Sequence, residues 1–530
     1  MRNSLKKSIC LLICLTLVLS CSIAIVSAAR DTALAVAATR DELMVPLTND
    51  YQSRTETVYN DINGEDVTVY GLYRETAESG HNPNFSQALM IYQAMKYKEK
   101  YPEKPVYVSI QSFHLSVALA ACVDPEKADY GHLKNLYDAD FNSDGYYRLS
   151  YLLVEAAKMG IEVCVVGQID AAGTTQEDGI VKPDFSFVNY FNSHLNDDAY
   201  EAGKKVSDFM TFGNCEWKSY GDKAAADMMH NKSCTVSNYI DNSGNEHGAA
   251  IWLGSINIDG VNINEQNGND SIQTAVVITG HEAMRRVLYN YAKLVAAYCR
   301  QEDVVPFRVE AISKTTEQVQ LIMAGKSDEI DADEQIVYLG TEDDDVFELY
   351  FTPLGGDFSV WDTVYNPFVK YISELLSASY GDDYIEFIWN NPKYTQNFEL
   401  GDYMLEAVNI AFERSANPEN VLHLHLPGAN GENFTNLTPG VNIGYKFFNG
   451  YYINYHIKDL QLSYVKGGER QYITVLNSLN IHEGSSYHQT NTILVIKEND
   501  TIGNDFYLEY AAMTVKEIDF LARRRLAAQS

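Results

Sequence analysis

Alternating apolar and polar residues mark strands along this chain, and apolar residues at helical spacing mark the helices between them. In the first half we predict strands over 67–73, 105–110 and 161–167, with helices over 85–98 and 147–159. A strand, a helix and a second strand in succession are typical of β-α-β units. The pattern therefore predicts a mixed α/β fold.

The second half repeats this order of elements. We predict strands over 347–351, 384–389 and 421–426, with helices over 365–378 and 401–415. Between the halves the sequence is acidic and rich in charge, which indicates a connector with at most a short element near 318–323. The chain is thus expected to contain two similar halves.

A polar motif follows these elements once in each half. It consists of His-x-Lys and, on the next strand, Ser-x-Asn: His230, Lys232, Ser255 and Asn257 in the first copy, and His456, Lys458, Ser478 and Asn480 in the second. Residues two apart in a strand project from the same face, so each pair points one way. An imidazole, a fixed positive charge, a hydroxyl and a carboxamide can together attack and hold a phosphoryl group.

These residues resemble the signature of the phospholipase D superfamily, which is His-x-Lys, then an Asp, then Gly-Ser-x-Asn. Ser237 and Ser463 stand at the Asp position, and Asn477 stands at the second Gly. Asp241 is a candidate substitute for the Asp in the first copy. The interval from Lys to Gly is longer than the family's, which predicts an extended β-hairpin between the two strands.

The family usually carries a Glu downstream, where this chain has Gln273 and Asn491. Because both copies depart from the signature in the same way, the sequence indicates a divergent subfamily. We expect these two amides, with Ser255 and Ser478, to contribute to substrate binding.

The resemblance implies two phospholipase D-like α/β/α sandwich domains, related by internal duplication and meeting about a pseudo-twofold axis. It also implies phosphodiester hydrolysis without a cofactor or an active-site metal. One histidine would attack phosphorus to give a phosphohistidine, and the other would protonate the leaving oxygen. His230 is our choice of nucleophile, although the sequence allows either order. Lys232, Lys458, Asn257 and Asn480 would hold the nonbridging oxygens.

The expected organisation follows from these elements. It comprises a signal peptide (1–28), an N-terminal arm (29–65), a first phospholipase D-like domain (66–301), an acidic connector (302–345), a second such domain (346–515) and a C-terminal tail (516–530).

The first residues predict export. Three basic residues precede an apolar run over 9–26, and small residues follow at 26–28, as in a secretory signal. A competing interpretation is a lipid anchor on Cys21, because residues 18–21 loosely resemble a lipobox. The mature chain would keep an odd number of cysteines, so at least one thiol should be free. The mature chain contains no second long apolar segment, so we expect no transmembrane helix in it.

Charge narrows the choice of substrate. The net charge of -32 disfavours polyanions unless a local basic cleft overrides it. A phospholipid or another small phosphodiester is therefore the favoured substrate. A nuclease of the same superfamily and a noncatalytic phosphoryl-binding surface protein are the alternatives, the latter because the family Asp and Glu are replaced.

One motif lies apart from the repeat. Asp140, Asn142 and Asp144 stand at alternate positions before a Gly, like the opening of a calcium loop. The twelfth position of such a loop should be an acid, but here it is Tyr151. We therefore favour a solvated acidic turn and keep calcium as the alternative.

Overall fold

The computed structural model describes the chain in separate stretches. They are residues 56–60, 66–74, 84–135, 142–143, 145–168, 174–175, 181–182, 186–215, 228–258, 270–299, 308–310, 319–322, 336–339, 347–351, 367–378, 386–389, 410, 425–426, 445–446, 453–455, 458–466, 468–478 and 489–498.

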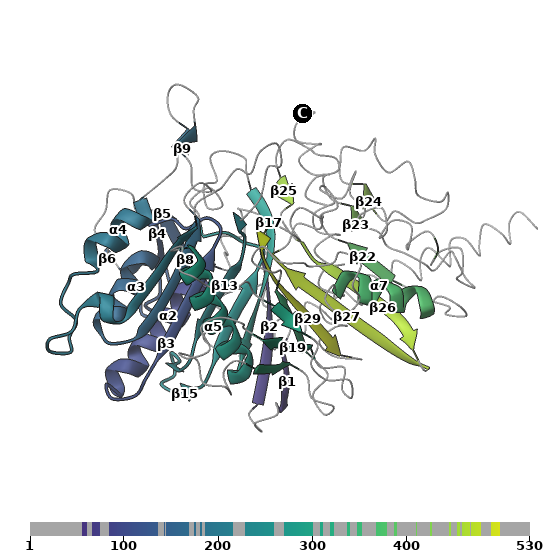
Figure 1. Ribbon diagram of the computed structural model, residues 1–530, viewed down its shortest axis with the longest axis horizontal. Helices are drawn as coiled ribbons and strands as arrows, with labels where there is room; N and C mark the ends of the chain where they lie inside the picture. The colour runs from purple at the N-terminus through teal and green to yellow at the C-terminus, as the bar shows by residue number, and fades with distance from the viewer. Residues whose placement is uncertain are drawn as a thin grey trace, which may run out of the picture.

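A nine-stranded sheet forms the first half of the molecule (Figure 1). In spatial order its strands are β1 (Glu56–Asn60), β2 (Asp66–Arg74), β17 (Asp270–Thr279), β16 (Ala250–Gly254), β13 (Lys232–Val236), β3 (Tyr107–Ser112), β8 (Glu162–Gln168) and β11 (Met210–Cys215), with β25 (Ile453–Tyr455) beside β17. Strands β3, β8 and β11 are parallel, and the pairs from β1 to β3 are antiparallel.

Helices cover both faces of this sheet. Helices α2 (Asn84–Lys100), α3 (Leu149–Lys158) and α4 (Ser186–His194) pack on one face, where Cys234, Trp252 and their neighbours are buried. Helix α5 (Glu282–Cys299) packs on the other face. Burial of one large apolar side chain stabilises the folded state by about 1.5–3 kcal/mol. The apolar residues that alternate along each strand therefore determine which face of the sheet a helix covers.

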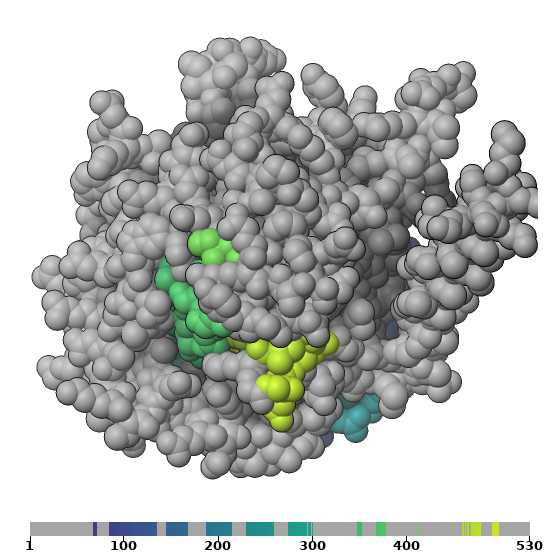
Figure 2. Space-filling model, turned by 90° about the vertical axis from the view of Figure 1, so that its right-hand side faces the viewer, coloured from purple at the N-terminus to yellow at the C-terminus, as the bar shows by residue number. Residues whose placement is uncertain are grey.

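A five-stranded antiparallel sheet forms the second half. Its order is β21 (Phe347–Phe351), β29 (Thr492–Glu498), β27 (Glu469–Asn477), β26 (Leu460–Lys466) and β22 (Glu386–Trp389). Helix α7 (Pro367–Ala378) packs against β26 and β27 and lies beside their hairpin at the surface (Figure 2). This order and sense match those of β2, β17, β16, β13 and β3 in the larger sheet.

A shared core joins the two sheets. Phe347, Leu349 and Phe351 of β21 are buried together with α5 and with the α5 face of the larger sheet. The rings of Tyr291 and Phe351 lie 4.0 Å apart between centroids. Strands β12 (Met228–Met229) and β28 (Gln489–Thr490) also pair in parallel across the junction. The halves therefore form one packed body at this boundary.

Short elements fill the rest of the described chain. They are β4 (Leu119–Cys122), β5 (Leu133–Asn135), β6 (Asn142–Ser143), β7 (Tyr146–Arg148), β9 (Thr174–Thr175), β10 (Val181–Lys182), η3 (Val206–Asp208), β14 (Tyr239–Ile240), β15 (Glu246–His247), β18 (Arg308–Glu310), β19 (Val319–Ile322), β20 (Ile336–Leu339), β23 (His425–Leu426) and β24 (Tyr445–Lys446).

Most predicted elements are confirmed, including the strands over 67–73 and 347–351 and the helices over 85–98 and 365–378. The helix predicted from 147 begins at Leu149, because residues 146–148 pair with β4 instead. The acidic connector contains a three-stranded sheet, β18-β19-β20, and not only the short element near 318–323. Most of the predicted elements at 401–415 and 421–426 lie outside the described residues.

The cysteines differ in their bonding. Cys122, Cys164 and Cys234 are free and buried, whereas Cys299 at the end of α5 is disulfide-bonded. Among the helices that the structure describes, none combines the length and the hydropathy needed to cross a membrane.

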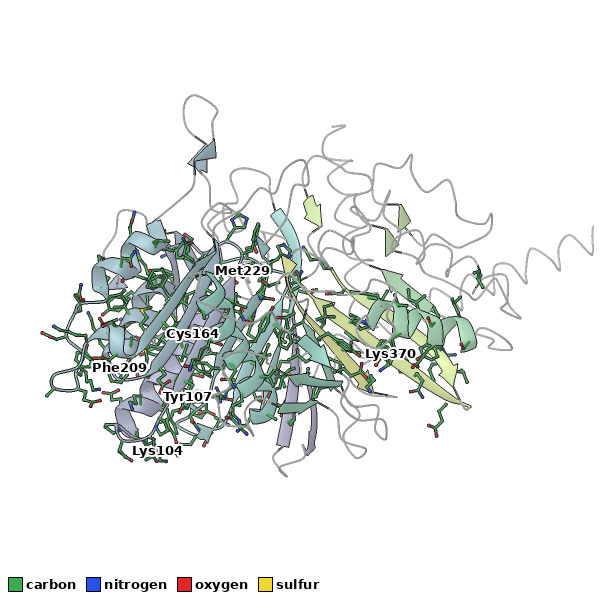
Figure 3. All side chains as sticks on the ribbon, viewed as in Figure 1. Lys104, Tyr107, Cys164, Phe209, Met229 and Lys370 are labelled. Atoms are coloured by element: carbon green, nitrogen blue, oxygen red, sulfur yellow. The ribbon has the colours of Figure 1, made fainter. Side chains whose placement is uncertain are left out.

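A buried carboxylate ties α7 to the second sheet. One oxygen of Glu348 accepts hydrogen bonds from Lys370 Nζ at 2.8 Å and Lys497 Nζ at 2.9 Å. The other accepts from the hydroxyls of Tyr350 at 2.6 Å and Tyr371 at 2.7 Å. Figure 3 shows Lys370 on the α7 side of the sheet. Burial alone would raise the pKa of Glu348, but the two lysines and the hydrogen bonds outweigh it and lower the pKa to about 2.

This network predicts an acid-dependent loss of stability. Because the pKa of Glu348 is lower in the folded than in the unfolded chain, its contribution is complete above the ordinary pKa of 4.5 and is lost as pH falls toward about 2. We expect Glu348→Gln to lower the free energy of unfolding at pH 7 by about 3 kcal/mol. Urea denaturation of both proteins between pH 7 and pH 3 should show the difference shrinking below pH 4.5.

Glu469→Gln is the matched control, because Glu469 is exposed at the β26–β27 turn. A difference between wild type and Glu348→Gln that stays constant down to pH 3 would contradict the prediction.

Candidate active site at the junction of the two sheets

The polar motifs of the two halves meet where β12 pairs with β28. The His230 backbone N–H donates to the Thr490 carbonyl at 2.9 Å, directly after the paired residues Met229 and Thr490. Figure 3 places Met229 at the end of the larger sheet opposite Lys104 and Tyr107. His230 and its partner Asn491 are 261 positions apart in sequence. The site is therefore formed by segments from both halves of the chain.

His230 is buried and oriented by the second half. Its Nδ1 lies 3.0 Å from the Asn491 side-chain oxygen, which also accepts a hydrogen bond from the Ser478 hydroxyl at 3.2 Å. The Phe113 ring packs edge-on against the imidazole, with centroids 5.0 Å apart. A carboxamide oxygen can only accept, so Nδ1 of His230 carries a proton.

The surroundings of His230 favour its neutral form. Burial, and then the charges of Lys232 and Lys458, lower the pKa of His230 well below its ordinary value of 6.5. Hydrogen bonds with Asn491 and with the Ser478 backbone oppose this shift only in part. At neutral pH the ring therefore carries no charge, which is the state needed for nucleophilic attack.

Lys232 and Lys458 bring two positive charges to the site, and each side chain is 1% exposed. Lys232 Nζ donates to the His230 carbonyl at 2.9 Å, so the lysine also fixes the backbone of the histidine. Both charges act on His230, so Lys458 of the second half lies near His230 of the first. Two buried ammonium groups provide the positive charge that an anionic phosphoryl group requires.

The two Ser-x-Asn segments hold their strand ends in the same way. Ser255 N–H donates to the Thr274 carbonyl at 2.9 Å, and Thr274 N–H donates to the Ser255 hydroxyl at 3.1 Å. Ser478 and Thr492 repeat both hydrogen bonds, each at 3.1 Å. The two hydroxyls are thus engaged with the neighbouring strand, and the substrate-binding role that we predicted for them stays a prediction.

Gly254 precedes the first of these serines and packs too closely for any side chain. A Cβ atom there would lie 2.6 Å from the Ala275 Cβ and 2.7 Å from the Thr274 carbonyl oxygen. The glycine of the Gly-Ser-x-Asn segment is therefore required by the close approach of β16 and β17.

Asn231, between the histidine and the lysine, bridges the halves through its amide. It donates to the Gln111 side-chain oxygen at 3.1 Å and to the Thr490 hydroxyl at 3.3 Å, and accepts from the Thr492 hydroxyl at 3.0 Å. A second bridge runs from the Thr274 hydroxyl to the buried Asp459 carboxylate. Asn231 is fully buried, so its amide is not accessible to glycosylation in the folded chain.

The other predicted residues fall in three groups. Asn257 is buried after β16, and its carbonyl accepts a hydrogen bond from the Asn84 amide at 3.0 Å. Gln273 pairs with Arg74 in the sheet, and its side chain lies outside the described residues. His456 and Asn480 also lie outside the described residues. Of the three residues of the calcium alternative, Asn142 begins β6, and Asp140 and Asp144 lie outside the described residues.

The extended hairpin predicted from the long Lys-to-Gly interval is confirmed in both halves, as β13–β16 with its β14–β15 tip and as β26–β27. Asp241 lies in the β14–β15 tip. It binds the backbone N–H groups of Ser243 and Asn245 and pairs with His247 Nε2 at 2.9 Å. Asp241 thus stabilises the turn of the hairpin tip, and its role as a substitute for the family Asp stays a prediction.

Sequence reasoning missed two residues of the site. Phe113 and His114 follow β3, and their rings are packed together with centroids 4.6 Å apart. Burial, and then the charge of Lys232, lower the pKa of His114 to about 3. The signal that could have revealed them is their position directly after a predicted strand, where functional residues gather in α/β folds. Across the described residues there is no group of three or more metal-binding side chains.

Neither a protein-family model nor a curated protein matches the sequence. Among solved structures, phosphatidylserine synthase from Haemophilus influenzae is 9% identical with a TM-score of 0.41, and the match covers 85% of each chain. Polyphosphate kinase from Porphyromonas gingivalis is 10% identical with a TM-score of 0.37, and covers 81% of this chain.

The match to that kinase spans 47% of the kinase's own length. A third structure, the phospholipase D family member Nuc from Salmonella typhimurium, is 11% identical with a TM-score of 0.20 over 43% of this chain and 92% of Nuc. Identity and TM-score are low in all three, so the functional proposal rests on the geometry of the site.

The neutral partner of His230 yields a prediction. Asn491→Asp would place a carboxylate against Nδ1–H and would raise the pKa of His230, because a nearby negative charge favours the imidazolium. NMR titration with labelled histidine should therefore show the His230 resonance titrating at higher pH in the variant than in wild type. Asp197→Asn, which removes a carboxylate from His194, is the control. An unchanged His230 titration in Asn491→Asp would contradict the hydrogen bond.

Proposed function

We propose that this chain is an exported, phospholipase D-like phosphodiesterase that acts on a phospholipid or a related phosphodiester through a phosphohistidine intermediate. One observation carries the proposal: the buried His230 imidazole is held by Asn491 of the other half, beside Lys232 and Lys458.

Internal duplication with pseudo-twofold symmetry is part of the proposal. Two findings support it. The five strands of the second sheet have the order and sense of β2, β17, β16, β13 and β3. The hydrogen bonds between Ser255 and Thr274 recur between Ser478 and Thr492. A repeated unit would place one histidine and one lysine on each side of a single phosphoryl group.

The proposed reaction has two steps. His230 Nε2 attacks phosphorus, and the bond to the leaving oxygen breaks as that oxygen takes a proton from His456. His456 then removes a proton from water or an acceptor alcohol, whose oxygen attacks phosphorus and releases His230. Lys232, Lys458, Asn257 and Asn480 stabilise the charge on the nonbridging oxygens. His456 and Asn480 receive these roles from the resemblance in the sequence.

Two features support export. The start of the sequence has the charged and apolar segments of a secretory signal, with a lipid anchor at Cys21 as the alternative. Cys299 is disulfide-bonded, and disulfides persist mainly in oxidising compartments. The net charge of -32 favours a small or lipid phosphodiester over nucleic acid.

Two histidine variants test the mechanism. His230→Ala should lower kcat/KM by about 10³-fold or more on every substrate, because it removes the nucleophile. His456→Ala should lower it by about 10²–10⁴-fold on a lipid phosphodiester, whose alkoxide leaving group needs a proton, and far less on an aryl phosphodiester. Steady-state kinetics on both substrates, and on single-stranded DNA, measure these effects.

His132→Ala is the control, since His132 is exposed and away from the junction. The opposite pattern would exchange the roles of the two histidines. Wild-type protein without activity on aryl, lipid or DNA substrates would make the noncatalytic alternative the better one.

A further inference from the structure

A second polar surface adjoins the catalytic residues, at the segment that follows β3. Leu115 forms a parallel bridge with Ile258, and the Ile258 N–H donates to the His114 carbonyl at 3.2 Å. Ser116 N–H donates in turn to the Ile258 carbonyl at 2.6 Å. Parallel pairing brings the preceding residues side by side as well, so His114 lies next to Asn257.

Two polar groups of this surface have no protein partner within the described part of the chain. The Asn257 side-chain oxygen is buried without a hydrogen bond. The His114 imidazole also makes no hydrogen bond, although it is only partly exposed. Buried polar groups normally find partners, so this pair is suited to a ligand that supplies hydrogen-bond donors.

The charges nearby restrict that ligand. Lys232 Nζ lies 5.5 Å from the centroid of the Phe113 ring, which packs against the His114 imidazole. Burial, and then the charge of Lys232, lower the pKa of His114. His114 therefore stays neutral over the physiological range, with one ring nitrogen that donates and one that accepts. A cationic headgroup would be repelled by the lysines, and a quaternary ammonium could donate no hydrogen bond to Asn257 or His114.

We propose that His114 and Asn257 form a subsite for the hydroxyl groups of a neutral polyol, such as glycerol, attached to the phosphoryl group. Within the proposed phosphodiesterase, this subsite selects polyol phosphodiesters over choline or ethanolamine esters. The Phe113 ring, between the two imidazoles, forms the apolar wall of the subsite. The inference rests on the proposed function only for turnover, because the same groups would recognise a polyol phosphate in an inactive protein.

Short-chain lipids test the selection without effects of a membrane surface. We expect wild type to hydrolyse monomeric dihexanoyl phosphatidylglycerol with a kcat/KM at least about tenfold above that of dihexanoyl phosphatidylcholine. His114→Ala should reduce this ratio by about tenfold, from the loss of hydrogen bonds to the polyol. His114→Asn, which keeps a donor and an acceptor, should retain most of the ratio, and the exposed control His132→Ala all of it.

Calorimetry with glycerol 3-phosphate and phosphocholine separates this inference from catalysis. Preferred binding of glycerol 3-phosphate that is lost in His114→Ala supports the subsite, even in a protein without turnover. A wild type that prefers the choline compounds, or a ratio that His114→Ala leaves unchanged in kinetics and in calorimetry, would overturn it. Circular dichroism of each variant identifies misfolded protein. If His114→Ala is misfolded, the comparison of wild type with His114→Asn is used instead.

Discussion

The site depends on buried polar contacts between two segments that are distant in sequence. Residues 228–231 lie against residues 489–492 through a parallel backbone pair and three side-chain hydrogen bonds. Asn231 bonds to Thr490 and Thr492, and His230 bonds to Asn491. Buried polar groups are costly unless every one finds a partner, so this junction has one favourable register. That register sets the distance between His230 and Asn491, and with it the chemistry of the site.

The same junction explains how the chain tolerates Asn491, an amide, where the resemblance leads one to expect an acid. A carboxylate beside His230 would stabilise the imidazolium, whereas Asn491 orients the ring and leaves it neutral. Lys232 and Lys458 act in the same direction and supply the positive charge for a phosphoryl group. Asn491 thus orients the imidazole of His230, while the ring stays neutral.

Most of the fold could be predicted from the sequence, because periodicity identifies strands and helices that bury one face, such as 67–73 or 365–378. The order of the strands in space could not, since it depends on long-range pairing. Among the site residues, His230 and Lys232 were found from their repeated motif. Phe113 and His114 carry no motif, and Asn231 looked like a spacer between its neighbours. The contacts of Asp241 could not be predicted either, because the β13–β16 hairpin pairs it with His247 in the tip.

The central claim is that His230 becomes covalently bound to phosphorus at this junction. The most direct measurement is mass spectrometry of peptides from protein mixed with an aryl phosphodiester and quenched at alkaline pH, where phosphohistidine survives. We expect a phosphoryl adduct on the peptide that contains His230, and we expect it to be absent once hydrolysis has consumed the substrate. Turnover without any adduct on that peptide, or with the adduct on another residue, would contradict it.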